Sequence, residues 1–203
     1  MKLVNFMVED NIRLGVKVEE GILDLAKTAG DFDFCIPETI EEVICGGQNM
    51  LEKLNKLIQQ ETCIIPEKEV VFAPCINNPE KIICIGLNYL DHANESKMEI
   101  PTSPVVFSKF NNALAAHQQE ILLPLNAKQF DYEAELVIVI GKTSRNISVE
   151  EAISSVFGYT IGNDLSARDL QFRNGQWLLG KTCDGFAPIG PYLVTSDEVD
   201  PFT

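Results

Sequence analysis

The stretch DYEAELVIVIGK, residues 131–142, decides the fold of this chain more than any other. Its apolar run from Leu136 to Ile140 follows two glutamates, which is typical of a buried strand that begins at a polar edge. Outward from it, the second half of the chain contains further strand-like runs at residues 81–86, 105–110, 157–164 and 187–195. Only short helical patterns separate these runs. The sequence therefore predicts a mainly β fold with short helices, of the α+β class.

A smaller unit precedes this region. Residues 1–8, 12–19 and 21–25 alternate between apolar and polar residues and predict three strands joined by tight turns. Thr39 and Glu42 then form a helix-capping pattern, and apolar residues follow at helical spacing. This segment has no histidine, so we expect a structural or interface role for it. We predict a small N-terminal α+β domain at residues 1–74 and a catalytic domain at residues 75–203.

Composition excludes several classes of protein. A hydrophobic fraction of 45% and a charged fraction of 23% are typical of a globular protein. The net charge of −14 argues against a nucleic-acid partner, since phosphate binding needs a surplus of Lys and Arg. No apolar run is long enough for a signal peptide or a membrane span. The six cysteines form no C-x-x-C pair, which argues against a zinc site. We expect a soluble, cytoplasmic protein without a membrane partner.

The first candidate site lies at the start of the deciding stretch. Glu133 and Glu135 are two residues apart, so in a strand they project from the same face. Two neighbouring carboxylates repel each other unless a cation or a shared proton relieves them, and a hard ion such as Mg²⁺, Mn²⁺ or Ca²⁺ prefers oxygen ligands. Asp164, at the end of another apolar run, could supply a third carboxylate. The alternatives are an exposed edge strand for the glutamates and a helix N-cap role for Asp164.

Three further segments carry reactive side chains. His92 is followed three residues later by Glu95, which could orient it as a general base, although a routine surface helix would show the same spacing. Arg168 and Gln171 can share the face of a helical turn and suit a substrate carboxylate. Lys181 could present an ammonium to an anionic intermediate, or it could be an ordinary surface lysine.

In order, these segments resemble the fumarylacetoacetate hydrolase family, in particular its branch of 2-hydroxyhepta-2,4-diene-1,7-dioate isomerases and acylpyruvate hydrolases. The resemblance covers residues 81 to 199. Six ordered motifs carry it: KIICIGLNYLDHANES, PVVFSKFNNAL, DYEAELVIVIGK, GYTIGNDLSARDLQ, GQWLLGK and GPYLVTSDE.

The resemblance implies a catalytic fold built around a mixed, partly rolled β-sheet, a divalent metal and a homodimer. It implies that Glu133, Glu135 and Asp164 are metal ligands and that His92 and Glu95 form a water-activating pair. It further implies that Arg168, Gln171 and Lys181 contact the substrate, with Lys181 also stabilising negative charge during the reaction.

The activity implied by the resemblance is metal-dependent hydrolysis of a C–C bond in an acylpyruvate-like 2-oxo acid. Decarboxylation of oxaloacetate-like acids and isomerisation of hydroxymuconate-type acids use the same enolate chemistry and remain alternatives. So do a metal-binding but inactive protein and a structural protein on the same scaffold. Members of the family continue beyond the position of Phe202 through a Thr- and Gly-rich loop. We therefore expect either a fragment of a longer protein or a sheet that another chain completes.

Overall fold

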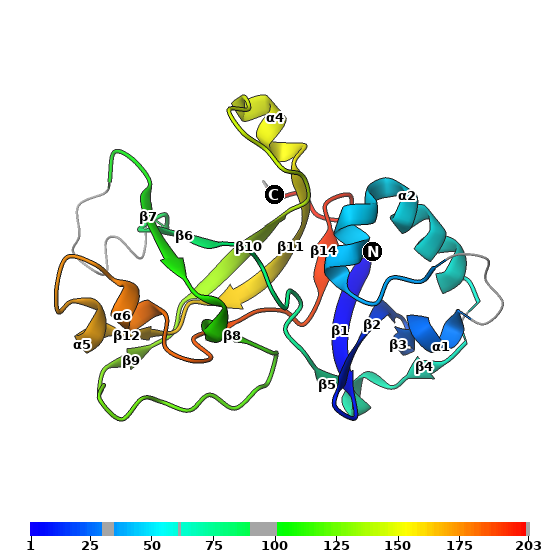
Figure 1. Cartoon of the computed structure of the whole chain (residues 1–203), viewed down its shortest axis with the longest axis horizontal. Coiled ribbons are helices and arrows are strands. Elements are labelled where there is room, and N and C mark those ends of the chain that lie inside the picture. Colours follow the sequence, from blue (N-terminus) through cyan, green and yellow to red (C-terminus); the bar gives the residue numbers. More distant parts are fainter. Residues whose placement is uncertain (30–34, 61, 90–100, 202–203) are drawn as a thin grey trace.

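A computed structural model describes residues 1–29, 35–60, 62–89 and 101–201. A large antiparallel sheet runs through them in the order β10–β11–β14–β1–β2–β3–β4, and β5 also pairs with β1 (Figure 1). Its strands are β1 (Lys2–Val8), β2 (Asn11–Val18), β3 (Gly21–Asp24), β4 (Ile64–Ile65), β5 (Val71–Phe72), β10 (Ala134–Ile140), β11 (Val156–Asn163) and β14 (Leu193–Thr195).

Three two-stranded sheets lie beside the large sheet in the described part of the chain, pairing β6 with β7, β8 with β13 and β9 with β12. Their strands are β6 (Ile82–Gly86), β7 (Val105–Lys109), β8 (Leu114–Ala115), β9 (Phe130–Asp131), β12 (Ser166–Ala167) and β13 (Ala187–Pro188). The helices are α1 (Leu25–Thr28), α2 (Ile40–Ile58), α4 (Val149–Ile153), α5 (Arg168–Gln171) and α6 (Leu178–Lys181), with 3₁₀ turns η1 (Glu67–Glu69) and η2 (Asn111–Ala113). The predicted mainly β fold with short helices is confirmed.

The N-terminal strands and helix form as their sequence pattern predicts. Tight turns connect β1 to β2 and β2 to β3, and both pairs are antiparallel. The side chain of Thr39 accepts a hydrogen bond from the backbone N–H of Glu42 and begins α2. The helix is kinked at Gly47, whose φ of 55° lies in the left-handed region that glycine adopts without strain.

The main hydrophobic core lies between the N-terminal strands and α2. Fully buried aliphatic side chains of the strands, such as Leu3 and Leu23, are in one cluster with Leu54 and Leu57 of the helix. On the other face of the strands, Phe6 and Ile22 form a second apolar cluster with side chains that include Phe72. Strands β1 and β3 are therefore buried on both faces.

The large sheet crosses the boundary predicted between two domains. Strand β1 pairs with β14, with Lys2 opposite Val194, so the first and last strands described are neighbours. The amino group of Met1 also donates to Thr195 Oγ1 at 2.6 Å and forms an ion pair with Glu198. The division at residues 74 and 75 stays a prediction, and the two parts on either side of it share one sheet.

Strands β10 and β11 have an apolar face that no described residue covers. In β10 the exposed residues alternate with half-buried ones, and Leu136, Ile138 and Ile140 are on the exposed face. Ile161, paired with Leu136 across β11, is exposed as well. Figure 1 shows β10 and β11 in the middle of the molecule, with α4 projecting beyond their ends and β6, β7, α5 and α6 on the side away from α2.

Two expected boundaries differ from the structure. Residues 187–195 do not form one strand, because the chain turns at Gly190 and Pro191, where Gly190 has a φ of 118° and proline has no N–H for a ladder bond. The deciding stretch, residues 131–142, is also not one continuous strand: Asp131 ends β9, which pairs with β12, and β10 begins at Ala134. None of the described helices is both long enough and apolar enough to span a lipid bilayer.

Candidate active site

The pairing of β10 with β11 brings two of the predicted carboxylates together. Ala134 lies opposite Asn163, so the residues just outside these strand ends, Glu133 and Asp164, are neighbours. The backbone N–H of Asp164 donates to the carbonyl of Glu133 at 2.9 Å, and the N–H of Glu133 donates to Asn163 Oδ1 at 3.2 Å. The pairing of the two strands thus holds Glu133 and Asp164 side by side at the same end of β10 and β11.

Lys181 connects these two carboxylates. Its Nζ lies 3.0 Å from Glu133 Oε2 and 2.6 Å from Asp164 Oδ2, and it sits 5.2 Å from the centre of the Phe107 ring. The Lys181 side chain is only 2% exposed, which excludes the alternative of a surface lysine. A buried ammonium requires such partners, because burial of an unpaired charge is strongly unfavourable.

Arg168 and Gln171 share one face of α5, as the sequence predicts. Arg168 Nη1 donates to Gln171 Oε1 at 2.8 Å. The same guanidinium donates to Asp131 Oδ2 from Nε and Nη2, at 3.1 and 2.7 Å, and to Glu133 Oε1. Every nitrogen of this guanidinium therefore has a protein partner, and one of them is the same Glu133 that Lys181 contacts.

Lys109 is a second buried lysine of the site. Its Nζ donates to the main-chain carbonyls of Leu165 and Phe186, at 3.1 and 2.6 Å. It also lies 2.6 Å from Asp164 Oδ1 as an ion pair, although the direction does not suit a hydrogen bond, so this buried oxygen has no hydrogen-bond donor among the described residues. Burial lowers the pKa of Lys109, and the attraction of Asp164 offsets part of that effect.

Glu133 and Glu135, the two glutamates of the deciding stretch, have opposite pKa shifts. Burial opposes the ionisation of Glu133, but the combined attraction and hydrogen bonds of Lys181 and Arg168 outweigh it, and the pKa of Glu133 is lowered. For Glu135, burial and then the negative charges of Glu133 and Asp164 raise the pKa, and the attraction of Lys181 and a hydrogen bond with Tyr89 oppose them in part. The negative charges of Glu133 and Asp164 thus disfavour the ionisation of Glu135.

The described part of the chain contains no group of three or more His, Cys, Asp or Glu side chains close enough to hold a metal as they stand. Lysines and Arg168 occupy the carboxylate oxygens of Glu133 and Asp164 instead. His92 and Glu95 lie outside the described residues. Their role as a water-activating pair and the ligand role of the three carboxylates stay predictions.

The residues present suit a divalent cation chemically. Carboxylate oxygens from Glu133 and Asp164 converge on the Lys181 ammonium. The second oxygen of Asp164 is buried 2.6 Å from the Lys109 ammonium, without a hydrogen-bond donor among the described residues. Glu135 adds a third carboxylate whose ionisation its surroundings disfavour. Carboxylate oxygens are the ligands that Mg²⁺, Mn²⁺ and Ca²⁺ prefer.

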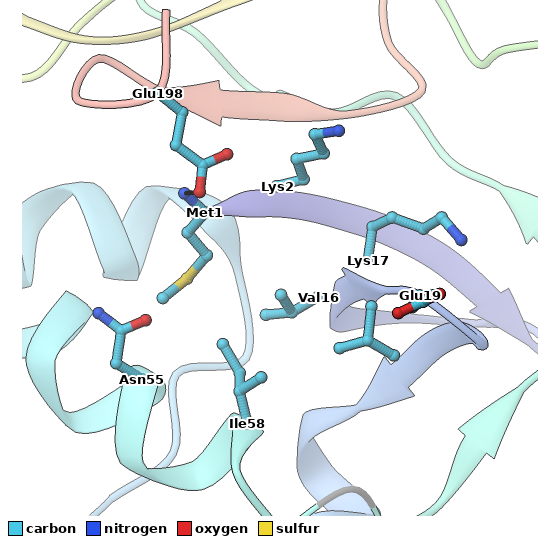
Figure 2. A pocket seen from close by; sticks show the side chains of 9 residues that line it. Met1, Lys2, Val16, Lys17, Glu19, Asn55, Ile58 and Glu198 are labelled. Carbon is cyan, nitrogen blue, oxygen red and sulfur yellow. Dashed lines mark ion pairs between the residues drawn. The ribbon is translucent and has the colours of Figure 1, made fainter.

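Two surface pockets lie away from this cluster. One, about 500 Å³ in volume, lies between the N-terminal strands and α2, where Asn55 and Ile58 face Met1 and Val16 (Figure 2). The other, about 440 Å³, is next to β5 and is lined by Phe72 and His117 among others. Neither pocket includes a residue of the carboxylate cluster, so we do not place the chemistry there.

Sequence reasoning missed three side chains of the site. Lys109 is the last residue of the apolar strand β7, at one of the alternate positions that face inward. A lysine at such a position could have indicated a buried charge. Asp131, which holds Arg168, lies in the deciding stretch but was not singled out. Cys84 of β6 is the third: burial raises the pKa of its thiol to about 11, and the charges of Asp164 and Lys109 both act on it.

Comparison with known proteins places this arrangement in context. Residues 81–203 match the family model described as fumarylacetoacetate (FAA) hydrolase C-terminal. A Dictyostelium discoideum protein, fumarylacetoacetate hydrolase domain-containing protein 2 homolog, is 46% identical over 98% of this chain and 66% of its own length. The rat mitochondrial oxaloacetate tautomerase Fahd2a is 38% identical over 98% of this chain. The chain spans 64% of the length of that tautomerase.

Solved structures agree with these sequence matches. The fumarylacetoacetate hydrolase of psychrophilic Exiguobacterium antarcticum is 32% identical, with a TM-score of 0.80, and the match covers 99% of this chain and 69% of that one. Maleylpyruvate hydrolase of Sphingobium sp. SYK-6, solved with manganese(II) and pyruvate, is 28% identical with a TM-score of 0.77. That match covers 99% of this chain and 70% of the hydrolase.

Proposed function

Since this chain belongs to the fumarylacetoacetate hydrolase family, we propose that its carboxylate cluster serves divalent-metal-dependent enolate chemistry on small 2-oxo acids. One observation carries the proposal: the carboxylates of Glu133 and Asp164 both contact the buried ammonium of Lys181. A metal ion would bind at this point between the two carboxylates. In this proposal Glu133, Glu135 and Asp164 bind the metal ion, and Mg²⁺ or Mn²⁺ suits these oxygen ligands. The manganese ion of the maleylpyruvate hydrolase supports the choice.

When bound, the metal ion would polarise the 2-oxo group and stabilise the negative charge of an enolate. The chain supplies the other parts. Lys181, Arg168 and Gln171 are close to the carboxylates and provide donors for the carboxylate and enolate oxygens of a substrate. The proposed His92–Glu95 pair would take a proton from water when the reaction is hydrolysis.

Two reactions on this scheme are supported by different observations. Hydrolysis of a C–C bond in an acylpyruvate-like acid is supported by the structural similarity to maleylpyruvate hydrolase. Keto–enol isomerisation of oxaloacetate is supported by the oxaloacetate tautomerases of several vertebrates, of which the rat protein is 38% identical to this chain. Isomerisation moves a proton between carbon and oxygen and needs no attacking water. We therefore rank it first, because the relatives that support it are more similar in sequence than the hydrolase.

The experiment compares the two reactions on the whole chain. Loss of the enol absorbance of oxaloacetate and release of pyruvate from acylpyruvates are followed with Mn²⁺ and with EDTA. We expect Mn²⁺-dependent turnover of oxaloacetate that Glu133→Ala abolishes. Glu150→Ala, which changes an exposed glutamate of α4, serves as the matched control and should retain activity. Stabilisation by Mn²⁺ without turnover of either substrate would favour a metal-binding but inactive protein.

Assembly and location are two further parts of the proposal. The family resemblance suggests a homodimer, which light scattering after size-exclusion chromatography tests directly. A cytoplasmic location also stays a proposal, and the tautomerases of rat and human are described as mitochondrial. Fluorescence microscopy of the tagged chain in its own cell would decide between these locations.

A further inference from the structure

Two buried lysines contact the same carboxylate. Lys109 and Lys181 have side chains only 2% exposed, and each Nζ lies 2.6 Å from one oxygen of Asp164, Lys109 at Oδ1 and Lys181 at Oδ2. The two side chains carry the same charge at the same distance. Any difference between their roles must therefore come from their other partners.

Lys109 is anchored on the main chain. It donates to the carbonyls of Leu165 and Phe186, which belong to separate segments, and Phe186 itself is 1% exposed within an apolar cluster. A cation that bound the carboxylates would leave both carbonyl contacts in place. Lys109 therefore keeps two of its three donors engaged whether or not Asp164 has another partner.

In the described part of the chain, the hydrogen-bond acceptors of Lys181 are carboxylates. The hydrogen bonds that the described residues offer to its Nζ come from Glu133 Oε2 and Asp164 Oδ2, both of which are metal ligands in the proposed function. Its third N–H has no hydrogen-bond acceptor among those residues, and the Phe107 ring lies 5.2 Å away. An ammonium on a flexible four-carbon stem can move once these two oxygens are taken.

We propose that Lys109 is a positioning residue that holds Asp164 in place, and that Lys181 is exchangeable, occupying the carboxylate oxygens that a divalent cation takes when it binds. This inference rests on the proposed function, since it assumes that Glu133 and Asp164 are metal ligands. Binding of the cation releases Lys181, and the freed ammonium becomes available to an anionic substrate. Metal binding and substrate binding are thereby coupled through one side chain.

The test is the affinity of the whole chain for Mn²⁺, measured by isothermal titration calorimetry in three proteins. These are the wild type, Lys181→Met and Lys109→Met, in which methionine replaces each ammonium by an uncharged side chain of similar length. Removal of either charge from beside Asp164 should strengthen cation binding by a similar Coulombic amount. Direct competition adds to this only for Lys181, whereas in Lys109→Met the loss of the contact that positions Asp164 weakens binding. We expect Lys181→Met to bind Mn²⁺ at least about tenfold more tightly than Lys109→Met.

A second measurement avoids the risk that a variant does not fold. In wild-type protein with ¹⁵N-labelled lysine, saturating Mg²⁺ should shift the ammonium NMR signal of Lys181 strongly and leave that of Lys109 nearly unchanged. Equal Mn²⁺ affinities for the two variants, or a Lys181 signal that Mg²⁺ does not move, would overturn this inference and leave the proposed function untouched. Absence of Mn²⁺ binding in all three proteins would overturn the metal site of the proposed function and the inference with it.

Discussion

The region around α2 and the region around Lys181 are both buried, but different forces hold them together. Around α2, aliphatic side chains such as Leu23, Leu54 and Leu57 are fully buried against each other. Around Lys181, the interior consists of alternating charges that include Lys109, Asp164 and Glu133. Apolar burial stabilises a fold directly, whereas a buried ion pair contributes little net stability, because desolvation offsets much of its attraction. The apolar and the charged interior are thus formed by different parts of the chain.

The two regions also differ in how well their strands are covered. Ile22 of β3 is completely buried, whereas Ile138 of β10 is 51% exposed although both belong to the same sheet. A face that is apolar and exposed adds little to the stability of the described chain. The contrast between these two isoleucines gives the first way to test the comparison.

The largest effect is expected from Ile22→Ala. Removal of this fully buried side chain should lower the free energy of unfolding by about 2–5 kcal/mol, because it leaves a cavity in the apolar cluster. Ile138→Ala is the matched control and should change stability by no more than about 0.5 kcal/mol. Urea unfolding of both variants measures the difference. Similar losses in the two variants would mean that the face of β10 is covered in solution.

The thiols give a second comparison of the two regions. Burial raises the pKa of Cys75, in the α2 core, to about 12 and that of Cys84, beside the carboxylates, to about 11. Since only the thiolate reacts, alkylation of Cys84 at pH 8 should be at least about a hundredfold slower than that of exposed Cys45. Cys75 should be slower still. Peptide mass spectrometry over time measures the three rates, and fast labelling of Cys84 would show that the site is open.

The two glutamates should give opposite pH dependences in metal-free protein. The lowered pKa of Glu133 stabilises the fold above the ordinary value of 4.5 and loses this effect as the pH falls through the folded-state pKa. Glu133→Gln should therefore be less stable than wild type at pH 7, with a difference that closes in acid. The raised pKa of Glu135 acts in the other direction.

For Glu135 the contribution to stability is present in acid and is lost as the pH rises through its folded-state pKa. Glu135→Gln should therefore match wild type below pH 4.5 and become the more stable of the two as the pH rises. Thermal unfolding in EDTA between pH 4 and 7 measures both variants. Two differences of the same sign would contradict the electrostatic account of the site.

A smaller effect on stability is expected at α4, which belongs neither to the apolar core around α2 nor to the charged cluster around Lys181. Ser148 and Glu151 form both hydrogen bonds of a capping box there. Ser148→Ala should destabilise this helix by about 1 kcal/mol. Hydrogen exchange of the α4 amides should accelerate, whereas the amides of α2 should not change. An effect that spread to α2 would mean that the two regions are more strongly coupled than their packing indicates.

Much of the fold could be predicted because its signals are local. The N-terminal strands and the start of α2 at Thr39 follow from residues within a few positions of each other. The break between β9 and β10 was not predicted, because it depends on the pairing of Asp131 with Ser166 across the chain. The antiparallel pairing of β1 with β14 could not be seen either, since nothing local marks partners so far apart.

By itself, the sequence determined the class of fold, the family and the carboxylates at the strand ends, because strand periodicity and motif order are properties of neighbouring residues. Only the tertiary structure decided how those carboxylates are neutralised. Lys109 and Lys181 come from separate elements and meet at Asp164, and neither segment carries a signal for the other. The physical reason is that a buried charge takes its partner from whatever the folded chain brings within contact distance, and the path of the chain sets that distance.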